Sequence, residues 1–214
     1  MTALLDTLAA SPWAYVVMAA ILVIDGFFPF VPGETGVVTL AALGAAGHGP
    51  IVWLVLVIAI VATMIGDGLA FVIGRRLRPD RWAWMRRPRV ARAFAWASSG
   101  LQRRPAVFLM VAKFVPFARV AVTMTAGAGG LPVRRYLPIS FAASTVYTSY
   151  HVVVAVIFGT AFAGSPLLGA GIAIVAVIVF GLLFEFLGFR RMPDVPEPVE
   201  VPEPAAGPKV PPSS

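Results

Sequence analysis

The chain has 214 residues, of which 59% are apolar and only 13% charged, and it contains no cysteine. A soluble domain carries about 25% charged residues, so this chain has too little polar surface to face water on all sides. The lack of cysteine excludes disulfides and thiolate metal sites. We therefore expect an all-α integral membrane protein, with a polytopic membrane domain over residues 1–191.

The net charge of +7 is unevenly distributed along the chain. No Lys or Arg precedes Arg75, ten Arg fall within Arg75–Arg104, and two pairs follow at Arg134–Arg135 and Arg190–Arg191. Basic residues between apolar stretches follow the positive-inside rule, so the charge calls for no nucleic-acid partner. The N-terminus has no basic region and Asp6 precedes the first apolar run. We therefore expect no cleavable secretory signal.

Three apolar stretches are long enough to cross a bilayer as helices, which takes about 20 residues. They are Ile51–Gly74, Tyr136–Phe162 and Leu167–Phe189. The turn between the last two is short, because Gly164, Ser165 and Pro166 directly separate them.

Two further apolar stretches, residues 14–47 and 105–131, are interrupted at their centres. The first contains two prolines, two glycines and two acids between Asp25 and Glu34, and the second contains Pro116 and a run of small residues after Arg119. Proline breaks a continuous helix. A broken backbone survives at membrane depth only where protein or water satisfies its polar groups. Both stretches are therefore predicted to be re-entrant helical hairpins.

The two hairpins have the outline of a repeat. Phe27–Phe30 resembles Phe114–Phe117, and each hairpin is followed by a long span. Re-entry of the second hairpin places all three basic clusters on the cytoplasmic side. The first hairpin then enters from the opposite face, which predicts two inverted repeats, each a hairpin plus a transmembrane helix, and one additional C-terminal transmembrane helix. This arrangement recurs in secondary transporters, with the site near the midplane.

Two segments lie outside this membrane frame. Residues 75–104 interleave aromatic residues with arginines, and either amphipathic surface helices or an ordinary cytoplasmic loop accounts for them. Residues 192–214 contain eight prolines and four acids, which predicts a disordered cytoplasmic tail.

Ionisable residues at membrane depth are candidates for function because they are costly to bury. The candidates are Asp25, Glu34, Asp67, Lys113, Arg119 and Glu185. The first hairpin holds acids and the second holds bases, so opposite charges meet if the hairpins meet. Arg119 and Lys113 could then hold an anionic phosphate. Asp25 and Glu34 could exchange a proton, because burial and a nearby arginine change a carboxyl's proton affinity.

A structural account of the same charges is a buried salt-bridge cluster that only joins the two hairpins. Asp67 either belongs to the site or pairs with an arginine. Glu185 is expected either to extend its carboxylate to the membrane interface or to pair near Arg190, and His151 is expected to be a hydrogen-bonded core histidine.

Three groups of residues together resemble the DedA family of bacterial membrane proteins. The first runs from Asp25 to Glu34, the second is Gly66-Asp67-Gly68 followed by Phe71 and Gly74-Arg75, and the third is Lys113-Phe114 with Pro116, Arg119 and Ala126-Gly127. The likeness runs in order from about Ile24 to Gly159.

The resemblance implies a transporter that flips undecaprenyl phosphate or a related phospholipid across the inner membrane, coupled to the proton gradient. It implies essential acids at Asp25 and Glu34 and essential basic residues at Lys113 and Arg119. This chain departs from the family at three positions. Lys113 stands where arginine is usual, Asp25 where glutamate is common, and Thr123 where proline is usual.

The alternative function is a proton-coupled transporter of a small ion or solute, and a purely structural membrane protein is a further one. An enzyme is not expected. A membrane aspartyl protease needs Gly-x-Gly-Asp, yet Met64 precedes Ile65-Gly66-Asp67. We therefore expect no catalytic residue, metal or cofactor. The expected partners are the lipid substrate, the bilayer and protons, and a homo-oligomer is left open. The expected location is the bacterial inner membrane, with several crossings and a cytoplasmic C-terminus.

Overall fold

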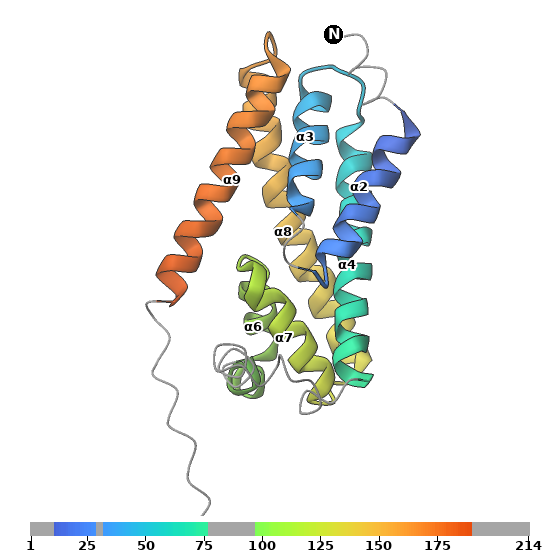
Figure 1. Cartoon of the computed structure of the whole chain (residues 1–214), viewed down its shortest axis with the longest axis vertical. Helices are drawn as coiled ribbons and strands as arrows, with labels where there is room; N and C mark the ends of the chain where they lie inside the picture. The colour runs from blue at the N-terminus through green and yellow to red at the C-terminus, as the bar shows by residue number, and fades with distance from the viewer. Residues whose placement is uncertain (1–10, 29–31, 77–96, 190–214) are drawn as a thin grey trace, which may run out of the picture.

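The computed structural model describes residues 11–28, 32–76 and 97–189, and within these ranges its regular structure is helical (Figure 1). The prediction of an all-α protein is therefore confirmed. The named helices, in chain order, are α2 (Pro12–Asp25), α3 (Gly33–Ala45), α4 (Val52–Arg76), α6 (Pro105–Ala112), α7 (Pro116–Ala128), α8 (Val133–Ala161) and α9 (Pro166–Phe189).

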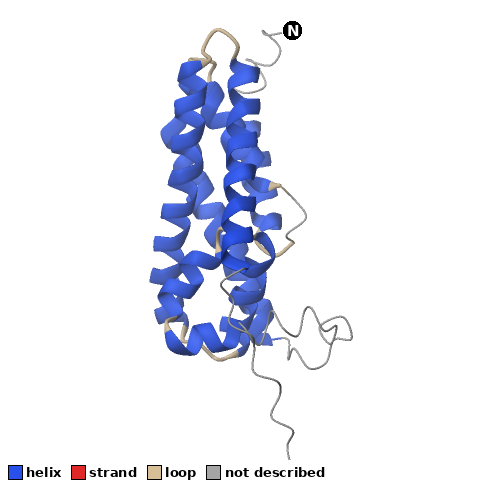
Figure 2. Ribbon diagram, turned by 90° about the vertical axis from the view of Figure 1, so that its left-hand side faces the viewer, coloured by secondary structure: helices blue, strands red, loops and turns tan. Residues whose placement is uncertain are grey.

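Two of these helices run the length of the molecule (Figures 1 and 2). α4 has 25 residues and α8 has 29, and both are long and apolar enough to cross a membrane. At 1.5 Å per residue they measure about 38 and 44 Å, against a hydrocarbon core of about 30 Å. Two of the three predicted spans thus form helices that are candidates for crossing a membrane, and the crossing itself stays a prediction. The third predicted span also forms a helix, α9, with 24 residues.

The other four helices form two short pairs, and each pair is interrupted where the prolines predict. α2 ends at Asp25 and α3 begins at Gly33, while α6 ends at Ala112 and α7 begins at Pro116. Proline suits the first turn of a helix because the amide hydrogen it lacks has no partner there. None of these helices exceeds 14 residues, or about 21 Å. In Figure 1 the two pairs occupy opposite ends of the bundle, with their breaks towards its middle.

Each long helix packs against the second helix of the opposite pair. α4 packs against α7, and α8 packs against α3. Glycines allow these close approaches: a Cβ on Gly127 of α7 would collide with the Phe71 carbonyl oxygen of α4, and one on Gly159 of α8 would lie 2.5 Å from the Ala42 carbonyl oxygen of α3. The long helix of each half thus packs against a short helix of the other half, and the two halves of the chain share this pattern of packing. Re-entry of the pairs into a membrane stays a prediction.

Large apolar side chains are exposed along the outer surface, and the largely apolar interior also encloses a group of polar and charged residues. α4 exposes a row of large apolar side chains at helical spacing: Trp53, Val57, Val61, Ile65, Leu69 and Val72. The interior buries polar or charged residues: Asp25, Thr63, Asp67, Lys113, Arg119, Thr123, Ser140, Ser144, Thr148 and His151. An apolar exterior around enclosed polar groups fits a lipid environment.

Several predictions lie partly or wholly outside the described residues. For the segment 75–104, residues 77–96 lie outside the described part. The tail 192–214 and Pro29 of the first break also lie outside it. α7 runs unbroken through Thr123, where the resemblance would place a proline. The domain limits at 191 and 192 stay a prediction.

Candidate functional site

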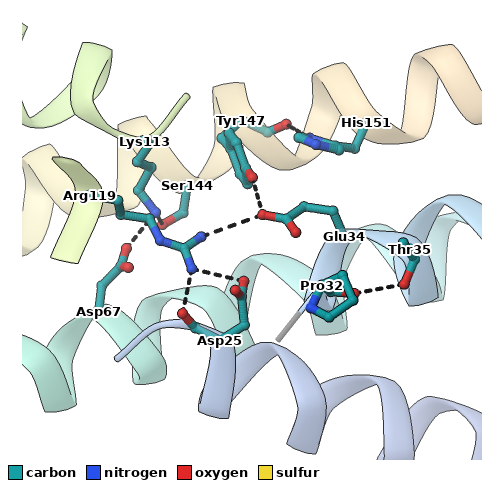
Figure 3. Close-up of polar contacts among 10 residues, drawn as sticks. All are labelled: Asp25, Pro32, Glu34, Thr35, Asp67, Lys113, Arg119, Ser144, Tyr147 and His151. Atoms are coloured by element: carbon teal, nitrogen blue, oxygen red, sulfur yellow. Dashed lines mark hydrogen bonds and ion pairs between the residues drawn. The ribbon is translucent and has the colours of Figure 1, made fainter. Parts of the chain in front are cut away.

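The helix breaks bring acids and bases together in the middle of the bundle. Asp25 is the last residue of α2 and Glu34 lies in the first turn of α3. Lys113 directly follows α6, and Arg119 lies in the first turn of α7. Figure 3 shows these side chains converging, together with Asp67 of α4. The structure thus brings together the four residues predicted to act in transport and Asp67, for which the sequence left two alternatives.

Arg119 joins both helices of the first pair. Its Nη2 donates to the backbone oxygen of Asp25 at 2.6 Å and to Asp25 Oδ2 at 2.8 Å. Its Nη1 lies 3.8 Å from Glu34 Oε1. The Arg119 side chain is only 4% exposed, whereas that of Glu34 is 25% exposed. We call Asp25, Arg119 and Glu34 the open unit, because Glu34 is accessible from outside.

A second contact to Glu34 comes from α8. The Tyr147 hydroxyl donates to Glu34 Oε1. The ring of Tyr147 lies between Phe114, with centroids 5.4 Å apart, and His151, with centroids 4.4 Å apart. His151 Nδ1 is 2.8 Å from the Tyr147 carbonyl oxygen. Because a carbonyl only accepts, Nδ1 carries the hydrogen. The predicted hydrogen-bonded core histidine agrees with this contact.

Lys113 forms a separate arrangement deeper in the protein. Its Nζ pairs with Asp67 Oδ2 and donates to Ser144 Oγ at 2.8 Å. The side chains of Lys113 and Asp67 are 4% and 2% exposed. We call Asp67, Lys113 and Ser144 the closed unit. Of the two alternatives for Asp67, the structure places it with the site, and its partner is a lysine rather than an arginine.

Charge is unbalanced across the two units. They contain three carboxyl groups but only two cationic side chains. A buried charge without a partner is strongly unfavourable, so one bound proton would balance the cluster. Two buried polar atoms, Asp67 Oδ1 and Arg119 Nε, have no hydrogen-bond partner among the described residues. The site therefore has unused hydrogen-bonding capacity at both an acid and a base.

A cavity of about 180 Å³ adjoins the open unit. Glu34, Tyr147 and His151 are among the polar residues that line it, and most of the other lining residues are apolar, including Val38 of α3 and Ile174 and Val177 of α9. Glu34 is therefore the charged group of the site that reaches this cavity.

Comparison with family models identifies the domain. The VTT domain model matches residues 28–157, which is more than half of the chain. The chain belongs to the VTT-domain family. This is the domain of the DedA family, so the resemblance seen in the sequence is confirmed. Together with the apolar helices, membership indicates a membrane protein. No curated protein and no solved structure gives a match.

The VTT match covers most of the site but not all of it. Glu34, Asp67, Lys113 and Arg119 lie inside residues 28–157, as do the contributing residues of α8. Asp25 lies three residues before the match, and α9, which lines the cavity, lies after it. The open unit is therefore completed by residues outside the VTT domain model.

Sequence reasoning missed Ser144 and Tyr147. Both lie on α8 in a row with His151, at positions 144, 147 and 151, which form one face of a helix. Polar residues at that spacing in an apolar helix were a usable signal for an inward face. Glu185 lies in α9, but its side chain is outside the described part of the chain, so its expected pairing stays a prediction.

Proposed function

We propose that this protein transports a lipid phosphate, such as undecaprenyl phosphate or a related phospholipid, between the leaflets of the bacterial inner membrane, driven by the proton gradient. VTT-family membership is consistent with a transporter-like role. The observation that carries the proposal is Arg119, whose guanidinium is shared by Asp25 and Glu34 where the two helix pairs meet.

The phosphate-binding step uses Arg119 first. A guanidinium presents a planar fork of donors that matches two phosphate oxygens. In the structure, carboxylates take the place that such a phosphate would occupy, and Nε has no partner among the described residues. Lys113, which the sequence predicted as a second phosphate ligand, is sealed in its pair with Asp67, so the proposal assigns the direct phosphate contact to Arg119.

The proton step follows from the competition between carboxylates and phosphate for Arg119. When Asp25 and Glu34 are ionised, they hold Arg119 and exclude an anion. When they are protonated, Arg119 is free to bind the phosphate, and loss of the protons expels it. This exchange would couple lipid movement to proton movement.

The proposed membrane arrangement places this exchange at mid-depth. α2 and α3 would enter from the outer face and α6 and α7 from the inner face, as inverted repeats, with α4, α8 and α9 crossing fully. The basic residues at 75–76 and 134–135 would then face the cytoplasm, and so would the C-terminus. Arg119 and Glu34 would meet near the midplane, where access from either side can alternate.

A transport assay tests the proposal. The protein is reconstituted in vesicles with a fluorescent analogue of undecaprenyl phosphate, and movement between leaflets is followed with and without a pH gradient. We expect movement that depends on the gradient and falls at least about tenfold in Arg119→Gln, a loss typical of a removed charge-assisted hydrogen bond. Glu34→Gln, which keeps the shape of the side chain, should lose the response to the gradient.

Arg134→Gln is the matched control, because Arg134 is an exposed arginine at the start of α8. It should transport like the parent. Unchanged transport in Arg119→Gln would contradict the proposal. Uptake of a small solute without lipid movement would instead favour the alternative of a proton-coupled solute transporter.

A further inference from the structure

The cavity beside the open unit has features that phosphate binding and proton exchange do not use. Its wall is largely apolar and comes mainly from α3, α8 and α9, with Pro32 and Phe114 added from the two helix breaks. Ile178 and Phe180, which line it, are 50% and 43% exposed, so the cavity borders the apolar outer surface. Val38, which also lines it, is only 1% exposed. The cavity therefore extends from the outer surface to a buried valine on α3.

The polar and apolar ends of the cavity are arranged like the two parts of a lipid. Glu34 lies at one end, with Arg119 Nη1 3.8 Å behind it. The remainder offers aliphatic and aromatic contacts without a further charged side chain among its lining residues. A polar site continuous with an apolar slot suits a ligand whose charged group is attached to a hydrocarbon chain.

The volume of the cavity limits its ligand to a short length of hydrocarbon chain. Its volume is about 180 Å³, and an apolar cavity of about 150 Å³ binds one benzene molecule. It therefore accommodates the first few carbons next to a headgroup, with the rest of the chain passing Ile178 and Phe180 into the bilayer.

We propose that the cavity between α3, α8 and α9 binds the headgroup-proximal hydrocarbon of a bilayer phosphate lipid, whose chain passes from the cavity into the bilayer beside the exposed Ile178 of α9. This inference rests on the proposed function, because it places the phosphate end of the same lipid at Arg119. It adds a chain-binding subsite and assigns its wall to α9, which lies beyond the matched VTT domain.

Gly181 offers a position at which a larger side chain would narrow the cavity. Gly181 lines the cavity, and an added Cβ would meet nothing within 4 Å. Gly181→Phe should therefore occupy the slot. Gly171 lies on the same helix and outside the cavity lining, and its Cβ also meets nothing within 4 Å, so Gly171→Phe is the matched control.

The probe is a phosphatidic acid with a diazirine on the first carbons of one chain, in vesicles of phosphatidylcholine and phosphatidylglycerol. Mass spectrometry compares photolabelling of Val38 with that of Val175. Val38 is 1% exposed and reachable through the cavity, whereas Val175 is 60% exposed and should be labelled directly from the bilayer. Because both residues belong to one chain, their ratio corrects for differences in insertion and yield.

We expect Val38 to be labelled in the parent and in Gly171→Phe. The Val38-to-Val175 ratio should fall about tenfold in Gly181→Phe, since losing about two buried methylenes weakens binding by roughly that factor. Gly181→Ala should give a smaller fall, and it provides the test if Gly181→Phe does not fold. An unlabelled Val38 in the parent, or an unchanged ratio in both Gly181 variants, would overturn the inference.

Two outcomes separate this inference from the proposed function. Gradient-driven transport that needs Arg119, without any Val38 labelling, would remove the chain subsite and leave the transporter intact. Val38 labelling that Gly181→Phe abolishes, in a protein whose transport ignores Arg119→Gln, would keep the subsite and remove the proposed function. Because the chain has no cysteine, Ile178→Cys also tests for a second copy: rapid disulfide-linked dimers would show that a protein surface fills the slot.

Discussion

The two ion-pair units at the centre of the molecule join the same two halves of the chain but differ in access. In the closed unit, Lys113 and Asp67 are 4% and 2% exposed. In the open unit, Glu34 is 25% exposed and lines the cavity. The geometry also differs, because Lys113 pairs with one acid whereas Arg119 is shared by two.

The difference in access indicates that the closed unit is a fixed structural contact, whereas the open unit is a contact that can change partners. A sealed ion pair must stay intact, because removing one partner leaves a buried charge with nothing to compensate it. A shared arginine beside an accessible acid can change partners while remaining partly compensated. We therefore expect the closed unit to govern stability and the open unit to govern transport.

The largest expected effect on stability comes from breaking the closed unit. Lys113→Ala leaves Asp67 buried and unpaired, which should lower the free energy of unfolding in detergent by about 3–5 kcal/mol. The double variant Lys113→Met with Asp67→Asn removes both charges and should recover most of that loss. If the recovered protein still moves lipid, Lys113 is needed for pairing and not for phosphate. If the double variant folds but does not transport lipid, the closed unit is needed for transport, and the proposed division of roles between the two units is wrong.

A smaller effect is expected from the packing that seals the closed unit. Gly66 precedes Asp67, and a Cβ there would lie 2.7 Å from the Val23 carbonyl oxygen of α2. Gly66→Ala should therefore push α2 from α4 and cost about 1–3 kcal/mol. Two residues along, an added Cβ on Gly68 meets nothing within 4 Å. Gly68→Ala should be neutral or up to about 1 kcal/mol more stable, and thermal unfolding of the pair measures the contrast.

The smallest expected change in stability lies in the open unit. Tyr147→Phe removes the hydroxyl that donates to Glu34. Because Glu34 is partly exposed, the loss should be about 1 kcal/mol or less, while the dependence of transport on pH should shift measurably. Tyr150→Phe is the control, since Tyr150 packs through its ring against Phe114 and Phe180. If the pH dependence of transport shifts equally in the two variants, the hydrogen bond from Tyr147 to Glu34 does not cause the shift.

Local chemistry made the helix breaks and the division of charge predictable. Pro32 directly precedes α3 and Pro116 begins α7, so the interruptions lie where these prolines predict them, although Pro138 lies inside α8 without ending it. The acids lie before the first long helix and the bases before the second. Once the two helix breaks are expected to meet, these opposite charges are expected to meet as well. The small buried residues of α4, such as Ala59, Gly66 and Gly74, also indicate which face turns inward.

The pairing of individual charges was not predictable in the same way. Lys113 and Asp67 are 46 positions apart, and their contact depends on how α4 and α8 are rotated and on the position of α6. The contributions of Ser144 and Tyr147 depend on the same rotation. Such contacts are set by tertiary packing, which no local pattern in one sequence fixes. Membrane insertion, the lipid and the proton dependence stay predictions that the assays above address.

The presence of two carboxyl groups on one arginine also bears on how membrane voltage acts on transport. Moving one elementary charge through the membrane field costs or yields about 2.3 kcal/mol per 100 mV. A phosphate monoester carries about −1.5 to −2 charges near neutral pH, whereas a diester carries one. Asp25 and Glu34, which share Arg119, can together carry two protons. That capacity would leave a doubly charged monoester electrically silent in transit, while a diester moving with two protons would carry current.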